Sequence, residues 1–198
     1  MAETREPQQK RAIEKKNRIV QAGYEMFAQK GYYNTNTAEI AKAAGVSTGI
    51  VYGYFHDKKD ILIDVLDIYI EHAYQPIFDL LDSFDLPADL GLLVPAAMDA
   101  AVKIHTDNAA IHEALHSLTQ HKDVESKFMA LEEEVTRRMA DKLQEAGVKR
   151  DNLYEKVHWA MVSVQAYAHE RVFDHHAYID YDAMRGIVIS LLDTLFEV

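Results

Sequence analysis

The sequence predicts an all-α protein, and three observations support this fold class. Apolar residues recur at helical spacing along most of the 198 residues, and no stretch of useful length alternates as a strand does. Eight glycines and four prolines are few for a chain of this length, which favours long helices. The chain has no cysteine, so a disulfide scaffold, a cysteine nucleophile and a thiolate metal site are excluded.

The first helix is expected over residues 10–30, where apolar and small residues recur at helical spacing. Gly31 follows at the position where a left-handed C-terminal cap belongs. A short second helix is then expected to run from residue 37 to about residue 43. Asn36 and Glu39 have the spacing of a capping box at its start, although Asn is not the usual first residue.

Gly45 ends the second helix, and Ser47 can cap a third helix that runs to about residue 55. Asp57 can cap a fourth helix, which Pro76 is expected to kink or end because proline removes an intrahelical hydrogen bond. The rest of the chain has helical periodicity throughout, which predicts further helices. The expected segments are residues 88–106, 109–118, 123–146, 151–174 and 181–197.

The last two of these helices carry apolar residues all round. In the segment 151–174, Val157 and Met161 lie on one face, and Trp159 and Val162 lie on another. A helix that is apolar all round is normally buried all round. Burial within one subunit would satisfy this pattern, but a small chain has little room for it. We therefore favour a homodimer formed through the two C-terminal helices.

The net charge of −11 is distributed unevenly. Residues 1–60 hold 10 Lys and Arg against 7 Asp and Glu, a net charge of +3, and residues 61–198 hold 11 against 25, a net charge of −14. This asymmetry fits a basic nucleic-acid-binding module on an acidic body, and it fits a solvated basic first helix equally well.

Residues 37–56 have the spacing of a helix-turn-helix. Ala41 is small where the two helices would cross closely, and Gly45 tolerates the positive φ that the tight turn needs. Val51 would pack on the inside of the helix pair. The second helix would then present its N-terminal side chains outward, where they can enter the major groove of DNA.

The first helix, this motif and a Tyr-x-Tyr-Phe pattern together resemble the TetR family of transcriptional repressors over roughly residues 18–62. The landmarks at matching spacing are Ala22, Phe27, Gly31, Thr37, Ile40, Ala41, Ala44, Gly45, Val46, Ser47, Gly49, Val51, Tyr52, Tyr54, Phe55, Lys58 and Leu62. The resemblance implies a three-helix DNA-binding domain at residues 1–56 and a helical ligand-binding and dimerisation domain at residues 57–198. It also implies a repressor that leaves double-stranded operator DNA when a small-molecule effector binds.

The resemblance implies DNA-binding roles residue by residue. Thr37 and Lys58 match phosphate contacts, and the groove-facing or backbone-contacting positions are Ser47, Thr48, Gly49, Tyr52 and Tyr54. Helix capping is the simpler interpretation of Thr37 and Ser47, and both roles can hold together. For the two tyrosines the simpler interpretation is packing.

The sequence departs from the family pattern at Gly53, where many members carry a side chain that helps to contact DNA. No Arg, Asn or Gln occurs between Ser47 and Phe55. Hydrogen-bond readout of guanine or adenine is therefore sparse, and we expect DNA shape, methyl groups and phosphates to carry more of the specificity.

Methionines and aromatic residues in the C-terminal part are candidates for an effector site, because such side chains adapt to varied apolar ligands. The candidate ligand-binding residues are Met98, His105, Phe128, Met129, Trp159 and Met161. Each of them is as easily explained as ordinary core. His105, with Asp99 and Glu113, could orient a polar or cationic group of the ligand. No cofactor is expected.

The sequence from His112 to His116 matches H-E-x-x-H, the zinc-protease signature. The alternative function is therefore a helical metal-dependent hydrolase that uses His112, Glu113 and His116. A structural metal or a ligand held by histidines of residues 105–121 is a further possibility. Such matches arise easily in a chain with ten histidines, so we favour solvated or packed histidines and expect no enzyme.

No membrane partner is expected, because the chain has no run of 18 apolar residues. The first 18 residues are polar, which does not fit a signal peptide. The sequence therefore predicts a cytoplasmic protein.

Overall fold

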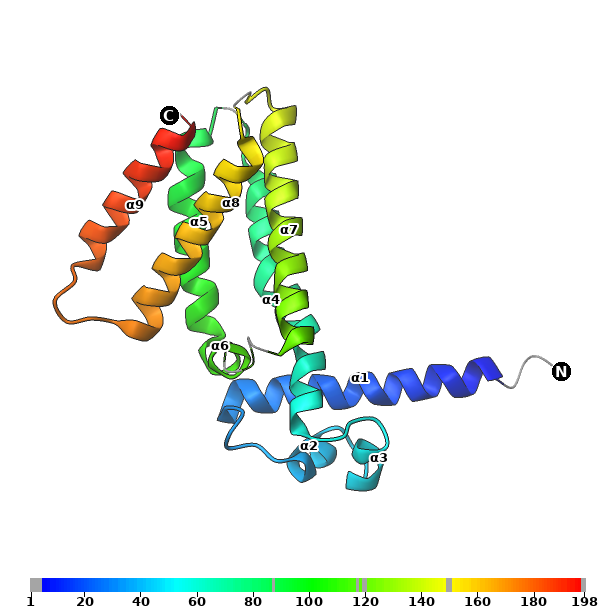
Figure 1. The fold of residues 1–198 in the computed structure, drawn as a ribbon. Helices are drawn as coiled ribbons and strands as arrows, with labels where there is room; N and C mark the ends of the chain where they lie inside the picture. The colour runs from blue at the N-terminus through cyan, green and yellow to red at the C-terminus, as the bar shows by residue number, and fades with distance from the viewer. Residues whose placement is uncertain (1–4, 87, 117, 119–120, 149–150, 197–198) are drawn as a thin grey trace. The chain divides into compact units, whose positions relative to one another are not determined.

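The computed structural model describes residues 5–86, 88–116, 118, 121–148 and 151–196. Every regular element in these ranges is a helix, which confirms the predicted fold class (Figure 1). The helices are α1 (Arg5–Lys30), α2 (Thr37–Ala43), α3 (Thr48–Tyr52), α4 (Lys58–Ser83), α5 (Leu90–Asp107), α6 (Ala109–His116), α7 (Lys122–Glu145), α8 (Leu153–His169), the π-helix η1 (Glu170–Asp174) and α9 (Tyr181–Phe196).

Several helix ends differ from the sequence prediction, and the helix expected over residues 151–174 is divided into α8 and the π-helix η1. α1 begins at Arg5 instead of residue 10, and α3 ends at Tyr52 instead of residue 55. α4 continues through Pro76 to Ser83, so the proline does not end this helix. Pro76 and His72 are both exposed, and water can therefore satisfy the His72 carbonyl that loses its intrahelical partner.

The chain divides into two compact units. Unit 1 is drawn from residues 1–72 and 108–125, and unit 2 from residues 73–107 and 126–198. α4 and α7 contribute residues to both units. Unit 1 is therefore larger than the predicted DNA-binding domain of residues 1–56, because the first half of α4 and the whole of α6 pack within it.

Unit 1 is held together by α1, which packs against α2 and α6, while α2 packs against α3. Its buried side chains include Ile19, Phe27, Ile40, Val51, Ile61, Leu62, Leu66, Tyr69, Ile111 and Leu115. Gly23 marks a close approach between α1 and α4. A Cβ atom at Gly23 would lie 2.7 Å from Cγ2 of Ile61 and 3.4 Å from Cγ2 of Val65, so this contact requires a glycine.

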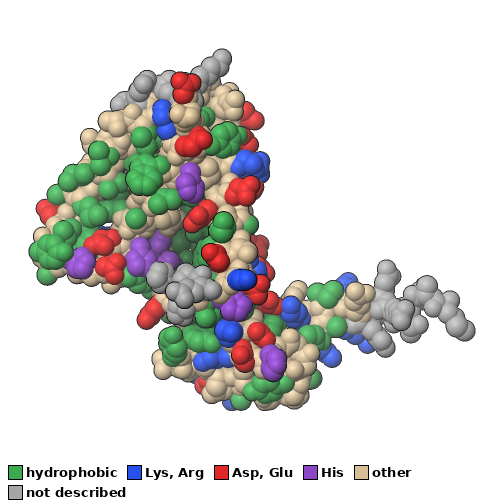
Figure 2. Space-filling model, viewed as in Figure 1, with side chains coloured by type: hydrophobic (Ala, Val, Ile, Leu, Met, Phe, Trp, Pro, Cys, Tyr) green, Lys and Arg blue, Asp and Glu red, His purple; other side chains and the backbone are tan. Residues whose placement is uncertain are grey.

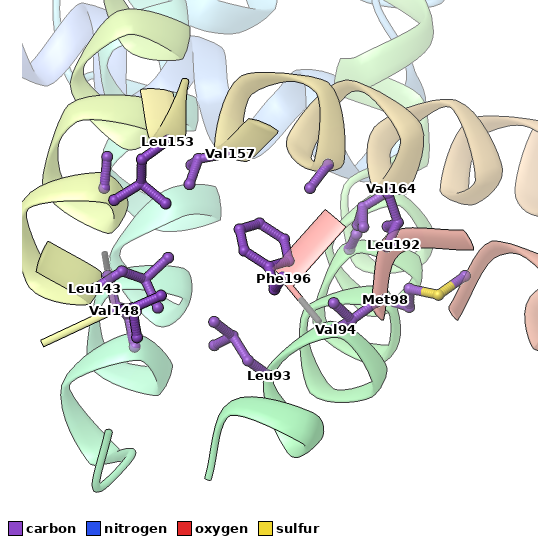
Figure 3. Close-up of a cluster of buried hydrophobic side chains, with 14 of the residues drawn as sticks. Leu93, Val94, Met98, Leu143, Val148, Leu153, Val157, Val164, Leu192 and Phe196 are labelled. Atoms are coloured by element: carbon purple, nitrogen blue, oxygen red, sulfur yellow. The ribbon is translucent and has the colours of Figure 1, made fainter. Parts of the chain in front are cut away.

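In unit 2, α5 packs against both α8 and α9 around an apolar cluster (Figure 3). The buried members that Figure 3 labels are Leu93, Val94, Met98, Leu143, Val148, Leu153, Val157, Val164, Leu192 and Phe196. Two polar contacts fix α7 beside the C-terminal part of α4. The Arg138 guanidinium lies 3.8 Å from the Phe78 ring centroid, and the Lys142 ammonium lies 3.3 Å from Asp82 Oδ1.

Replacing Gly23 with alanine should lower the free energy of unfolding by about 1–3 kcal/mol, because the new methyl group overpacks a buried contact. Gly186→Ala is the matched control, since a Cβ atom there meets nothing within 4 Å. The control should be neutral or stabilising by up to about 1 kcal/mol. Urea unfolding of both variants at one protein concentration makes the comparison. Equal stability of the two variants would contradict the close approach of α1 and α4.

Candidate functional site

The start of α2 is fixed by the capping box that the sequence predicts. Asn36 Oδ1 accepts a hydrogen bond from the Glu39 amide at 3.0 Å, and Glu39 Oε2 accepts one from the Asn36 amide at 3.1 Å. The Lys30 ammonium donates to the other Glu39 oxygen at 2.9 Å. These bonds, led by the one from Lys30, lower the pKa of Glu39. The end of α1 and the start of α2 are therefore joined through one carboxylate.

The turn between α2 and α3 has the geometry that a helix-turn-helix needs. Gly45 has a φ of +68°, a conformation that L side chains rarely adopt. The Val46 amide donates to the Ala41 carbonyl at 3.0 Å, and Ala41 is buried. Ser47 Oγ accepts from the Ile50 amide at 3.4 Å, which caps α3. The predicted helix-turn-helix is thus present.

A hydrogen bond between two side chains joins α2 to α3. Thr37 Oγ1 and the Tyr52 hydroxyl lie 3.1 Å apart, which connects the first residue of α2 to the last residue of α3. Tyr52 remains 57% exposed, so its ring is accessible to a large partner such as DNA. Of the other predicted contact residues, Ser47 and Gly49 are exposed at the start of α3, and Thr48 and Tyr54 are half-buried.

Lys58 is more constrained than its predicted role as a phosphate contact suggests. Its ammonium group donates hydrogen bonds to the carbonyls of Tyr32 and Thr35, both at 2.7 Å, and lies 4.2 Å from the Tyr32 ring centroid. Burial lowers its pKa. An ammonium has three donors, so one remains for a phosphate. The structure therefore gives Lys58 a positioning role in the loop between α1 and α2.

Unit 2 encloses a second candidate site, a cavity of about 60 Å³. Its lining residues come from α4, α5, α7, α8 and α9. Most are apolar, including Leu93, Val94, Met139, Met161, Val164 and Phe196, and the polar ones are Tyr74, Gln165 and Asp193. A cavity of roughly 150 Å³ is needed to hold benzene. An organic ligand would therefore have to displace some of these side chains.

Only one of the six predicted ligand-binding residues, Met161, lines this cavity. Met98 is fully buried in the core, and Phe128 is half-buried elsewhere. Trp159 and Met129 are 61% and 62% exposed. The six residues lie on α5, α7 and α8, three of the five helices that line the cavity, and their proposed role in ligand binding stays a prediction.

His105, the remaining predicted ligand residue, is a buried core histidine. Its Nδ1 lies 2.8 Å from the Ala101 carbonyl, and its ring packs against those of His169 and Phe173. Burial lowers the pKa of His105, which favours the neutral ring.

Sequence reasoning missed the three polar residues of the cavity wall, Tyr74, Gln165 and Asp193. One signal for Asp193 exists. It interrupts the apolar run of the last helix at a position that shares a face with Ile189, Leu192 and Phe196.

The H-E-x-x-H segment forms part of α6. His112 Nδ1 lies 3.2 Å from the Tyr69 hydroxyl, and Glu113 is exposed. The side chain of His116 lies outside the described residues. Among those that the structure describes, no group of three or more His, Cys, Asp or Glu side chains could hold a metal ion. No described helix has the length and apolar character needed to cross a membrane.

These features define a class of protein with a helix-turn-helix in one compact unit and a cavity in a second, helical unit. Residues 19–65 match the family model described as "Bacterial regulatory proteins, tetR family". Residues 19–65 therefore form a TetR-family helix-turn-helix domain, as the sequence landmarks implied.

The chain is similar to the HTH-type transcriptional regulator HbdR of Aromatoleum sp. (strain CIB), with 45% identity over 60 residues. That match covers 28% of this chain and 26% of HbdR, so it spans about a quarter of the relative's length.

Two solved structures share the fold over most of the chain. A regulator from Syntrophomonas wolfei assigned to the TetR family is 20% identical with a TM-score of 0.63, and covers 93% of this chain and 96% of its own. FadR of Bacillus subtilis in complex with stearoyl-CoA is 18% identical with a TM-score of 0.57, and covers 88% of this chain and 96% of its own.

Lys58→Ala should lower both stability and DNA affinity. Loss of two charge-assisted hydrogen bonds should reduce the free energy of unfolding by about 1.5–3 kcal/mol. If the third donor binds a phosphate, the slope of log affinity against log salt should fall by about 1. Lys59→Ala is the control with the same change in charge. Urea unfolding and gel shifts over a salt series measure the two effects, and a Lys58 variant as stable as the Lys59 variant would contradict the positioning role.

Proposed function

We propose that this protein is a homodimeric, ligand-responsive repressor that binds operator DNA through α2 and α3 and releases it when an apolar effector occupies the cavity of unit 2. The observation that carries the proposal is the α2–Gly45–α3 geometry, with Ser47 capping α3 and the Thr37–Tyr52 pair exposed beside it. Such a regulator would act in the bacterial cytoplasm, where its operator lies.

The proposed DNA-binding residues are Thr37, Ser47, Thr48, Gly49, Tyr52, Tyr54 and Lys58. Free amides at the start of α3 can bind a phosphate, and the small side chains there allow the backbone to approach the groove closely. The exposed Tyr52 ring is suited to contact with a thymine methyl or the sugar–phosphate backbone. The net charge of −14 over residues 61–198 would repel DNA elsewhere and limit nonspecific binding.

Exposed apolar side chains on α8 and α9 support the proposed dimer. Hydrophobic surface gathers over these two helices in Figure 2. Trp159 and Val162 of α8 are 61% and 37% exposed, and Ile187 and Leu191 of α9 are 60% and 62% exposed. A second copy that covers this patch would remove it from water and account for the two-sided apolar pattern of the sequence.

The cavity supports the proposed effector response. FadR of Bacillus subtilis, which shares the fold, is solved with stearoyl-CoA, so this fold can bind a ligand that carries a long hydrocarbon chain. In this chain, Tyr74 and Ile77 of α4 line the cavity, and α4 begins at Lys58 in the DNA-binding unit. A ligand that shifts α4 would therefore act on the helix whose first residue holds the loop before α2.

The test of this function is selection of a duplex from a random library, followed by affinity measurements on the selected duplex. We expect a near-palindromic site, with two half-sites about 34–36 Å apart or a multiple of that spacing, and affinity that falls steeply with salt. Binding that shows no preference between the selected and scrambled duplexes would overturn the proposal, and a pure dimerising adaptor would then be the better interpretation.

Thr48→Ala should change which base pairs are preferred in one half-site position, because the hydroxyl at the start of α3 faces the groove in the proposed complex. The expected loss of discrimination is about 1–3 kcal/mol at that position. Repeating the selection with the variant measures the change. Thr106→Ala, far from the helix-turn-helix in sequence, is a control that should leave the selected site unchanged. An identical selected site for Thr48→Ala would contradict its proposed role.

Ile187→Arg combined with Leu191→Arg should convert the dimer to a monomer and abolish specific DNA binding. Both side chains are exposed in a single chain and would be covered only by a second copy. The pair of charges should cost little in the fold but cannot be buried against a second copy. Tyr178→Arg is the control, because Tyr178 is 82% exposed outside α8 and α9. Light scattering and gel shifts measure both effects. A monomeric variant that keeps full operator affinity would contradict the proposal that DNA binding requires the dimer.

A further inference from the structure

Asp193 carries a buried oxygen that no described part of the chain satisfies. The residue lies on α9, on the same face as Leu192 and Phe196, which are 2% and 5% exposed. It lines the cavity of unit 2. Its Oδ1 atom is buried and has no hydrogen-bond partner among the described residues. The helix therefore directs a carboxylate into a site where its pattern predicts an apolar side chain.

The cavity wall contains no group that would neutralise this carboxylate. None of the described residues that line it is Lys, Arg or His. Tyr74 and Gln165 supply only neutral polar groups, and burial and the charge of Glu132 raise the pKa of Tyr74 to about 12, so its phenol stays protonated. Asp193 as a whole is half-buried, but a carboxylate oxygen that is buried without a hydrogen-bond donor or a counter-charge is disfavoured.

We propose that the cavity takes a cationic apolar amine, whose ammonium group donates to Asp193 Oδ1 and whose hydrocarbon part lies among the apolar side chains. This inference rests on the proposed function, because it names the chemical class of the effector for the same cavity. The ammonium supplies a donor to Asp193 Oδ1 and the positive charge that the described cavity wall lacks. A carboxylate ligand would place two like charges together and is disfavoured.

Two flexible residues can provide the space that the ligand needs. The cavity of about 60 Å³ is lined by Met139 and Met161, which are both half-buried. Methionine has three rotatable bonds and adopts alternative rotamers at little energetic expense, so these side chains can open the cavity without breaking the helices.

A matched set of six-carbon probes tests the ligand class. Titration calorimetry on the full chain should show hexylamine binding about tenfold or more tightly than 1-hexanol, and hexanoate binding more weakly than either. Asp193→Asn should remove the preference for hexylamine. Asp182→Asn is the control, because it removes the same charge from an exposed position of the same helix and should keep the preference.

Asp193→Leu provides a second, independent readout. It replaces a carboxylate that has one buried, unpartnered oxygen with an apolar side chain, and the melting temperature of the ligand-free protein should rise. Equal binding of the amine and the acid by the original chain, or an amine preference that survives Asp193→Asn, would overturn the inference.

The proposed function is tested separately, by gel shifts with the selected duplex in the presence of each probe. Release of DNA by hexanoate but not by hexylamine would leave the effector response standing and reject the amine class. Tight binding of hexylamine by a chain that shows no specific DNA binding would support the amine class and reject the proposed function.

Discussion

The ammonium group of Lys58 is the point on which the arrangement of the DNA-binding helices depends. Lys58 is the first residue of α4, and its ammonium group donates hydrogen bonds to two carbonyls of the loop between α1 and α2. That loop leads into Asn36, whose capping box fixes the start of α2 and is itself joined to the end of α1 through Glu39. Because the turn at Gly45 then determines where α3 lies, the recognition surface is positioned by contacts that involve α1 and α4.

Much of this unit could be predicted from the sequence, because its determinants are local. Helical periodicity, the Asn36–Glu39 spacing and the glycine at position 45 each act within a few residues. The bonds of Lys58 could not be predicted, since its two acceptors lie 26 and 23 residues away along the chain and are backbone carbonyls, which every residue carries. Gly23 is similar: its need for a glycine arises from Ile61 on another helix.

The proposed effector site was harder to predict for a related reason. Methionines and aromatic rings are common both in a packed core and on a subunit interface, and composition does not separate these cases. Met98 lies in the core, whereas Trp159 lies with the exposed apolar surface of α8. Only the packing of five helices determines which faces leave space between them. The informative residue was instead a polar one, because Asp193 is unexpected on the inner face of α9.

The small size of the cavity bears on how an effector would control DNA binding. A ligand shifts a conformational equilibrium only through its difference in affinity for the two states, and a tenfold change in DNA affinity needs about 1.4 kcal/mol of such difference. At about 60 Å³ the cavity would have to open before an organic effector could enter, so in the proposed mechanism the described conformation would be the one with the lower effector affinity. Opening the cavity requires movement of its walls, and Tyr74 and Ile77 of α4 are two of them. If α4 moves as one helix, the displacement reaches Lys58 and the loop that it holds. The free energy of effector binding would then act on the spacing of the recognition helices, although the effector and the DNA share no residue.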